Sequence, residues 1–235
     1  MGRGQNGILS NSLVKGVIDT RISKVCPKHS TVICITMSDG RVRCPVCMTE
    51  WRRNRRIRQR QWIVDKFGGQ CSRCGYEPIE ALEFHHIDPR SKNKTINQLL
   101  GYKREIILQE AAKCILLCAN CHAEEGAQKN RVPTGRMSNK RRKRMISIAG
   151  DCCCLCGYDR CGKALDFHHL LPEQKKFEIS GNGIVQSELK VFIEARECIL
   201  VCRNCHRSIH SKKSSSTSIS HRIATDLMGY RNTTY

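Results

Sequence analysis

The chain has 235 residues, of which 41 are Lys or Arg and 21 are Asp or Glu, and its formal net charge is +20 at pH 7. An excess of positive charge this large favours a polyanionic partner, with nucleic acid first and an anionic membrane surface second. No stretch is apolar for long enough to span a bilayer, and the opening segment "MGRGQNGILSNSLVKG" lacks the apolar core of a secretory signal. The composition therefore argues against a secreted or membrane-spanning protein and predicts a cytoplasmic protein that binds nucleic acid.

The 17 cysteines are grouped mainly as Cys-x-x-Cys and Cys-x-x-His pairs. This spacing is typical of metal ligands, whereas a disulfide framework has no reason to prefer it, and an intracellular compartment keeps thiols reduced. Only 5% of the residues are aromatic, so no large core is available. Modules of about 60 residues bury too little surface to be stable without a cross-link. We therefore expect an α+β protein made of small modules that structural zinc stabilises.

The first expected module occupies residues 22–50, after an N-terminal segment of residues 1–21. Its stretch "VICITMSDGRVR" alternates like the two strands of a hairpin with a turn at Ser38-Asp39-Gly40. A metal-ligand pair flanks the hairpin on each side, which is the outline of a zinc ribbon. The expected zinc ligands are Cys26, His29, Cys44 and Cys47.

Two basic runs are expected to contact phosphates, which positions a protein on nucleic acid without reading its sequence. Residues 51–67 predict a basic helix that ends at Gly68-Gly69, and residues 131–147 predict an exposed basic linker. Residues 212–235 predict a flexible tail rich in Ser and Thr. The expected phosphate contacts are Arg52, Arg53, Arg55, Arg56, Arg58 and Arg60 in the helix, and Lys140, Arg141, Arg142, Lys143 and Arg144 in the linker.

Residues 68–130 and 148–211 are two copies of one pattern, named module 1 and module 2. "CSRCGY", "LEFHH" and "ILLCANCH" of module 1 match "CCLCGY", "LDFHH" and "ILVCRNCH" of module 2. The offset grows only from 82 to 84 residues along the pattern, so the chain contains an internal duplication. Each copy predicts a knuckle, a strand that ends at two histidines, a loop, a helix, a second strand, a second knuckle and a final helix.

Each module carries two Cys-x-x-Cys pairs, which together supply four thiolates for a closed tetrahedral zinc site. The expected ligands are Cys71, Cys74, Cys118 and Cys121 in module 1, and Cys153, Cys156, Cys202 and Cys205 in module 2.

The modules also contain histidines that such a zinc does not need. Neighbouring side chains on a strand point to opposite sides, so one histidine of each pair can bind a metal while the other faces a substrate. The histidine after the second knuckle could complete that metal site, and His210 lies one helical turn after His206. The pattern predicts an open site for a divalent ion beside a histidine that takes a proton from water.

The combined string "CxxCGY…LxFHH…CxLLCxNCH" resembles the HNH endonucleases, or ββα-metal nucleases, of phages and mobile elements. The resemblance covers roughly residues 68–126 and 150–211 and implies two tandem ββα-metal domains. It implies that His86 and His169 are the catalytic bases. The implied ligands of Mg²⁺ or another catalytic divalent ion are His85, His122, His168, His206 and His210.

The chain departs from the family at two places. The middle asparagine of the family usually stands nine residues before the final histidine, where this chain has Lys113 and Glu197. Asn97, in the loop of module 1, is the expected catalytic helper, although module 2 has Ser180 at that place. Module 1 has Gly126 where module 2 has His210, and the sequence leaves open whether one or both modules are active.

The resemblance implies a metal-dependent endonuclease that hydrolyses double-stranded DNA and leaves 5′-phosphate and 3′-hydroxyl ends. One alternative is a zinc-finger DNA-binding regulator without catalysis, which has no need of His86 or His169. Another is a nuclease that acts on RNA or branched DNA. The recognition sequence and the oligomeric state are left open.

Overall fold

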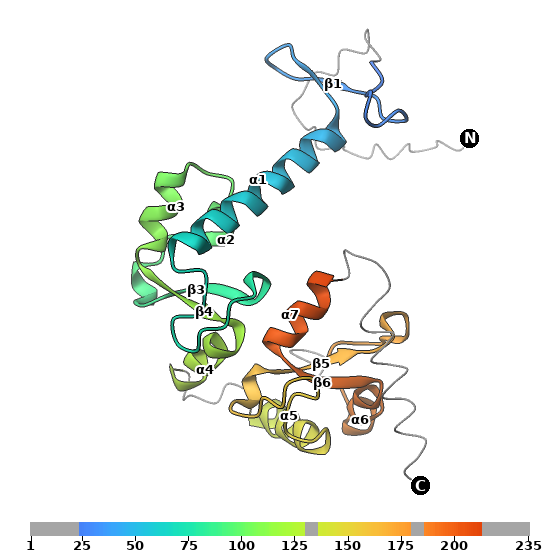
Figure 1. Cartoon of the computed structure of the whole chain (residues 1–235). Coiled ribbons are helices and arrows are strands. Elements are labelled where there is room, and N and C mark those ends of the chain that lie inside the picture. Colours follow the sequence, from blue (N-terminus) through green and yellow to red (C-terminus); the bar gives the residue numbers. More distant parts are fainter. Residues whose placement is uncertain (1–23, 130–135, 180–185, 213–235) are drawn as a thin grey trace, which may run out of the picture. The chain divides into compact units, whose positions relative to one another are not determined.

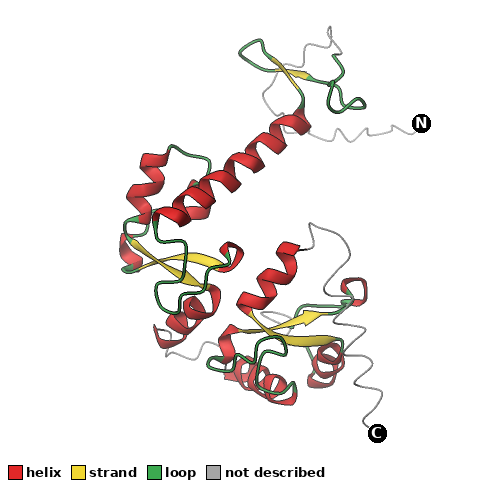
Figure 2. Ribbon diagram, in the orientation of Figure 1, coloured by secondary structure: helices red, strands yellow, loops and turns green. Residues whose placement is uncertain are grey.

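The computed structural model describes residues 24–129, 136–179 and 186–212. They form a mixed α+β structure with three two-stranded sheets (Figure 2). The chain divides into two compact units, Met1–Gln59 and Arg60–Tyr235. The expected N-terminal segment, nearly all of the expected tail and the position of Ser180 lie outside the described residues. None of the helices described is both long and apolar enough to pass through a membrane.

The expected hairpin is present in the first unit. Strand β1 (Ile35–Thr36) pairs antiparallel with β2 (Val42–Arg43), and Gly40 in the turn between them has a φ of +76°. The helix that follows, α1 (Pro45–Lys66), begins six residues earlier than expected. Proline suits the first turn of a helix because its fixed φ is already helical and its missing N–H has no partner to lose.

Module 1 is built on a hairpin of two strands that lie far apart in the sequence (Figure 1). Strand β3 (Leu82–His86) pairs antiparallel with β4 (Cys114–Cys118), and α4 (Ala119–Lys129) follows β4 directly. Two short helices, α2 (Ile96–Leu99) and α3 (Arg104–Ala111), form part of the long connection between the strands. This order agrees with the elements expected from the sequence.

Module 2 repeats the arrangement. Strand β5 (Leu165–His169) pairs antiparallel with β6 (Cys198–Cys202), α6 (Glu188–Arg196) precedes β6, and α7 (Arg203–Lys212) follows it. The register is the same in both sheets, because the second histidine of each pair stands opposite the first cysteine of the partner strand. A shift by one residue would exchange the two faces of a strand, so the shared register places equivalent histidines on equivalent sides.

The segment expected to be an exposed linker is helical over α5 (Arg136–Ile148). Met145 and Ile146 of this helix are buried in module 2. Their counterparts Ile63 and Val64, at an offset of 82 residues, lie near the end of α1 and are buried in module 1. The duplication therefore includes the helix before each module. Most residues of α5 are basic or polar. Only two adjacent apolar residues are buried, so the sequence shows no helical pattern of apolar residues by which the helix could be predicted.

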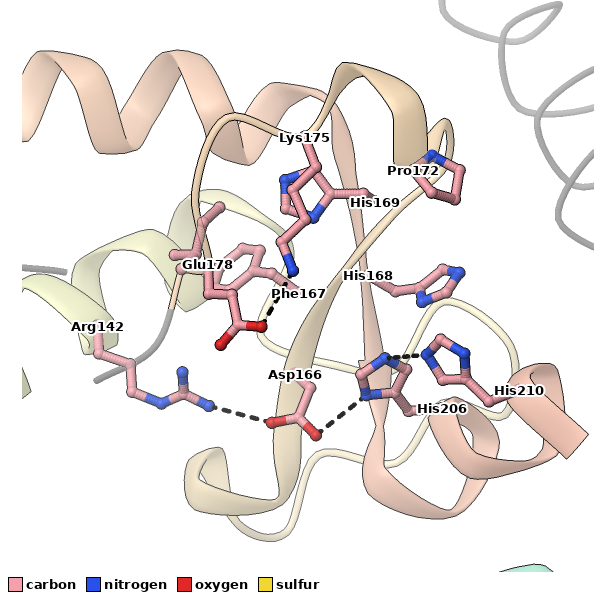
Figure 3. A pocket seen from close by; sticks show the side chains of 11 residues that line it. Arg142, Asp166, Phe167, His168, His169, Pro172, Lys175, Glu178, His206 and His210 are labelled. Carbon is pink, nitrogen blue, oxygen red and sulfur yellow. Dashed lines mark hydrogen bonds and ion pairs between the residues drawn. The ribbon is translucent and has the colours of Figure 1, made fainter. Parts of the chain in front are cut away.

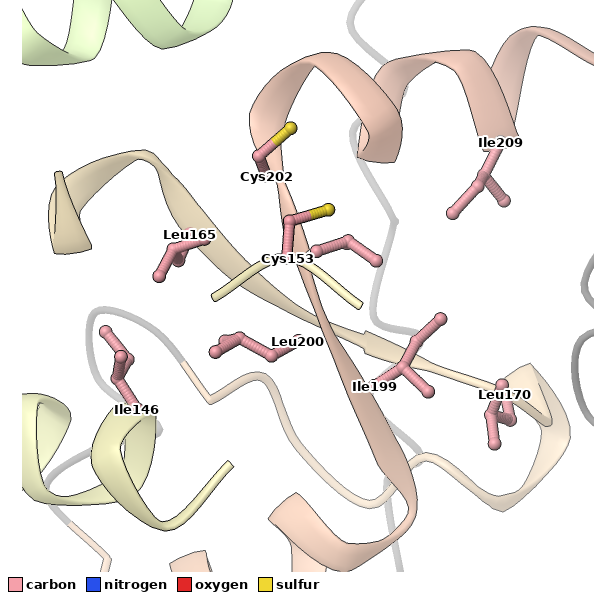
Figure 4. Packing of buried hydrophobic residues seen from close by; sticks show 9 residues of the cluster. Ile146, Cys153, Leu165, Leu170, Ile199, Leu200, Cys202 and Ile209 are labelled. Carbon is pink, nitrogen blue, oxygen red and sulfur yellow. The ribbon is translucent and has the colours of Figure 1, made fainter. Parts of the chain in front are cut away.

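The cores are small and contain cysteines that are expected to bind zinc. In module 2, Leu165 and Leu200 from the sheet pack with Cys153, Cys202 and Ile209 (Figure 4). A core of this size contributes little hydrophobic stabilisation, which agrees with a need for a metal cross-link.

Candidate metal centres

Three clusters of thiol and imidazole groups bring together the twelve ligands expected for zinc. In each cluster the four ligand atoms lie within 4.8 Å of one another. The clusters are Cys26, His29, Cys44 and Cys47; Cys71, Cys74, Cys118 and Cys121; and Cys153, Cys156, Cys202 and Cys205.

Distances within these clusters fit a tetrahedral metal. The sulfur atoms of Cys74 and Cys118 lie 3.7 Å apart, as do those of Cys156 and Cys202. A tetrahedron with zinc–sulfur bonds of about 2.3 Å has edges of about 3.8 Å. The sulfurs of a disulfide would lie only about 2.05 Å apart. The clusters could therefore hold metal ions such as zinc.

A fourth cluster, made only of histidines, lies in module 2. His168 at the end of β5 faces His206 and His210 of α7 (Figure 3). The ring centroid of His168 lies 5.0 Å from that of His206 and 5.2 Å from that of His210. The Nε2 atoms of His206 and His210 lie 3.1 Å apart. Three imidazoles converging from a strand and a helix form an open ligand set.

A carboxylate orients the middle histidine of this cluster. Asp166 Oδ2 lies 3.3 Å from Nδ1 of His206, so Nδ1 carries the proton and the lone pair of Nε2 faces His210. Arg142 lies 3.7 Å and Arg203 3.8 Å from the same carboxylate. Burial raises the pKa of Asp166, but His206 and the two guanidinium groups outweigh burial and lower it.

Module 1 repeats this geometry with one ligand fewer. The rings of His85 and His122 lie 4.9 Å apart, and Glu83 contacts Nδ1 of His122 as Asp166 contacts His206. Burial raises the pKa of Glu83, but hydrogen bonds from His122 and Arg207 overcome it and lower the pKa to about 2. Gly126 stands in place of the third histidine, so only two imidazoles of the set remain.

The second histidine of each pair lies apart from these clusters. Both His86 and His169 are buried. Nε2 of His86 lies 2.9 Å from Oε1 of Glu110, and Nε2 of His169 lies 2.7 Å from Oε1 of Glu194. In Figure 3 the ring of His169 lies well away from His206 and His210. In each pair the first histidine therefore belongs to a cluster of imidazoles, and the second contacts a glutamate.

The carboxylate of Glu110 is fixed by several donors. It accepts a hydrogen bond of 2.7 Å from Nζ of Lys113 and one of 2.8 Å from the backbone N–H of Asn93. Lys113 and the other donors outweigh burial and lower the pKa of Glu110 to about 2. Lys113 therefore contacts His86 indirectly, through Glu110.

The carboxylate of Glu194 is held in the same way. Its Oε1 accepts backbone N–H bonds of 2.9 Å from Lys176 and 3.4 Å from Phe177. Burial raises the pKa of Glu194, but these donors and His169 lower it. Glu194 is therefore an ionised group in a fixed position beside His169.

Each module has one pocket that is lined both by the clustered histidines and by the histidine that contacts a glutamate. The pocket of module 1 has a volume of about 320 Å³ and is lined by His85, His86 and His122. The pocket of module 2 has a volume of about 420 Å³ and is lined by His168, His169, His206 and His210. Both volumes lie at the lower end of the range of about 300–1,000 Å³ that is typical of pockets for small molecules.

Asn97 lines the pocket of module 1, and its Oδ1 accepts a hydrogen bond of 3.1 Å from Nη1 of Arg60. The residue that holds His86 is Glu110.

The glutamates were not expected to belong to the site. Glu110 and Glu194 stand four residues before the cysteine that begins β4 or β6, and Glu83 and Asp166 stand two residues before the first histidine of each pair. Because these acidic residues recur at equivalent places in both copies, the duplication could have indicated that they belong to the site. Carboxylates on a strand and a helix otherwise look like ordinary surface residues.

The expected phosphate-contacting residues differ in their surroundings. Arg52, Arg53, Arg56 and Arg58 are exposed on α1, as are Lys140 and Lys143 on α5. Arg55 is half-buried and lies over the ring of Trp51.

The other basic residues bind groups of the protein. Arg60 donates to Ile79 O and Leu82 O, and its counterpart Arg142 donates to Leu165 O. Both therefore line the pockets instead of the outer surface of their helices. Arg141 donates to Gln186 O, and Arg144 forms an ion pair with Glu188.

Comparisons with protein-family models, with curated protein sequences and with solved structures gave no match to this chain.

Proposed function

We propose that the protein is a metal-dependent endonuclease of the HNH type that hydrolyses phosphodiester bonds in double-stranded DNA. One observation carries the proposal. In each module a carboxylate-bound, buried histidine and a cluster of imidazoles line the same pocket. A structural zinc site needs neither feature, and a DNA-binding regulator has no use for an oriented base.

The donor set favours a transition-metal ion. His168, His206 and His210 would hold it in module 2, and His85 and His122 would do so in module 1. Imidazoles suit Zn²⁺, Ni²⁺, Cu²⁺ or Fe²⁺, whereas Mg²⁺, the first ion that the resemblance implies, and Mn²⁺ prefer oxygen ligands. A bound ion would neutralise the charge of the scissile phosphate and stabilise the leaving oxygen.

The residues of the chain would provide the base. With Nε2–H of His169 directed at Glu194, the lone pair of Nδ1 is the one that can accept a proton from water. Glu194 holds the ring in that tautomer and stabilises the imidazolium that forms. His86 and Glu110 would do the same in module 1. The exposed arginines of α1 would bind neighbouring phosphates.

The test is nicking of supercoiled plasmid by the purified full-length protein with Mg²⁺, Mn²⁺, Co²⁺, Ni²⁺ or Zn²⁺. Loss of a general base costs about 10²–10⁴-fold in rate. We expect His86→Ala and His169→Ala each to remove the contribution of one module, and the double variant to be inactive with unchanged zinc content and circular dichroism. Wild-type protein that binds DNA but nicks it with none of these ions would support the regulator instead. Parallel reactions on RNA and on branched DNA identify the preferred substrate.

A further inference from the structure

Modules 1 and 2 contact each other through equivalent residues. The backbone N–H of Asn120 donates to Oδ1 of Asn204, and the backbone N–H of Asn204 donates to Oδ1 of Asn120, both at 3.1 Å. Both asparagines are buried, and they occupy the same place in the second knuckle of each module. A reciprocal pair of this kind is the signature of a two-fold contact between like subunits, here within one chain.

The contacts beside this pair follow the same symmetry. Tyr158 of module 2 donates a hydrogen bond of 2.5 Å to Glu124 on α4. Tyr76, the counterpart of Tyr158, interacts with Ser208 on α7, which is the counterpart of Glu124. The helix after each second knuckle therefore contacts the other module.

The symmetry is broken next to Ser208. Arg207 of α7 forms an ion pair with Oε1 of Glu83 in module 1, while Oε2 of Glu83 contacts Nδ1 of His122. The counterpart of Arg207 in α4 is Ala123, so the equivalent place on α4 has no cation to offer to module 2. One carboxylate of module 1 thus bridges its own histidine and a guanidinium of its neighbour.

Module 2 obtains the equivalent cation from its own helix. Arg203 of α7 lies 3.8 Å from Asp166, which holds His206 as Glu83 holds His122. The counterpart of Arg203 in module 1 is Ala119, which is fully buried and carries no charge. Among the described residues, module 1 has no cation at the place of Arg203, and Arg207 of module 2 supplies a guanidinium to Glu83 in addition to the nearby Arg60.

We propose that Arg207 of module 2 is a positioning residue for the metal centre of module 1, because it fixes Glu83 against Nδ1 of His122 and so keeps Nε2 of His122 available as a ligand. The inference rests on the proposed function. Partners behind a metal-binding histidine fix its tautomer, and their loss typically costs about 10–100-fold in metal affinity or activity. The centre of module 1 would then depend on its neighbour, whereas that of module 2 would not.

The experiment isolates module 1 in the full-length chain by removing the base of module 2 with His169→Ala. In this background we expect Arg207→Gln to lower plasmid nicking about 10–100-fold. Arg207→Lys, which keeps a cation beside Glu83, should recover part of the loss. The matched control is Ser208→Ala, which removes the neighbouring contact with Glu80 from the same helix. If Ser208→Ala lowers nicking as much as Arg207→Gln, the effect is a general loosening of the contact between the modules and the proposal fails.

A second readout does not require nuclease activity. Long-range ¹H–¹⁵N spectra of the histidine side chains report which ring nitrogen carries the proton, and His122→Gln assigns the signals of His122. We expect the Nδ1–H tautomer in the wild-type protein and in Ser208→Ala, and a mixture of tautomers in Arg207→Gln. An unchanged His122 tautomer in Arg207→Gln overturns the proposal. If no variant nicks nucleic acid at all, the proposed function fails, and the tautomer still decides the role of Arg207.

Discussion

Oε1 of Glu194 lies 2.7 Å from Nε2 of His169, and both side chains are buried. Because the backbone of Lys176 and Phe177 binds the same oxygen, the carboxylate cannot turn away from the imidazole. The ring therefore has one favoured tautomer and one orientation. Glu110 and His86 form the same pair in module 1. The pair is therefore a feature of the duplicated unit, and the contact did not arise by chance.

The first prediction concerns this pair. Glu194→Gln keeps the shape of the side chain and, through the amide oxygen that the backbone of Lys176 and Phe177 binds, its hydrogen bond with His169, but it removes the negative charge that stabilises the imidazolium. In a His86→Ala background, where module 2 alone would act, we expect nicking to fall by about 10²–10⁴-fold, as for an orienting carboxylate in a catalytic triad. Initial rates of nicking give the measurement.

The control for this change lies in the same pocket. Glu178 lines the pocket of module 2 but pairs with Lys175 at 3.1 Å and is largely exposed. Glu178→Gln should leave nicking nearly unchanged. Equal activity of Glu194→Gln and Glu178→Gln would show that His169 needs no orienting carboxylate.

The second prediction concerns the difference between the two centres. His210 supplies a third imidazole in module 2, and Gly126 occupies its place in module 1. We expect the zinc-loaded wild-type protein to bind Ni²⁺ or Co²⁺ more tightly in module 2, and His210→Gly to weaken that site by about tenfold or more. Gly126→His should strengthen the site of module 1, because no atom lies within 4 Å of a Cβ built at Gly126. Calorimetric titration measures both sites.

Gln128→His provides the matched control for this exchange. It adds an imidazole to α4 at an exposed position away from His122. Metal affinity in module 1 should not rise in this variant. A rise equal to that of Gly126→His would mean that any added histidine recruits metal, and the idea of a missing third ligand would be wrong.

Much of this fold could be predicted from the sequence because ligand spacing and duplication are local signals. The thiolate clusters follow from Cys-x-x-Cys pairs, which place two sulfurs on one tight turn. The strand that ends at His85 and His86 follows from alternation, and its partner strand follows from the apolar run before the second knuckle. Repetition of both patterns predicts the two modules, but it does not reveal that the duplication includes the helix before each of them.

Contacts between distant polar residues could not be predicted in this way. Glu110 reaches His86 across 24 residues and Glu194 reaches His169 across 25, because α3 and α6 pack beside the strands. The role of Asn97 as a catalytic helper stays a prediction: Asn97 lines the pocket of module 1, and its Oδ1 accepts a hydrogen bond from Arg60. The burial of the end of α5 could not be predicted, because a segment with so many basic residues is usually exposed to solvent.

The third prediction concerns the zinc sites. We expect three zinc ions per chain bound through thiolates, and loss of secondary structure when a strong chelator removes them, because metal binding supplies much of the folding energy of such modules. Cys118→Ser should remove one ion and destabilise module 1, since this sulfur is buried in its core. Elemental analysis and circular dichroism provide the measurements.

Cys154 is a suitable control, because it is exposed and belongs to none of the clusters among the described residues. Cys154→Ser should keep three ions and the wild-type spectrum. A spectrum that survives complete removal of zinc would contradict a structural role for the clusters.

The fourth prediction concerns the basic face of α1. Arg52, Arg53, Arg56 and Arg58 are exposed, and each phosphate that a cation neutralises releases condensed counterions from DNA. The slope of log K against log salt changes by about 0.9 for each such contact, so replacing all four arginines by Gln should reduce the slope by up to about 3.6. Fluorescence anisotropy of a labelled duplex between about 50 and 200 mM salt covers the range in which such contacts change affinity most clearly.

Arg73→Gln is the control. Because Arg73 already forms ion pairs with Glu124 and Glu125, this variant should leave the slope nearly unchanged. An equal slope in the fourfold variant and the wild-type protein would mean that DNA binds elsewhere on the chain, since a lost phosphate contact cannot leave the release of counterions unaltered.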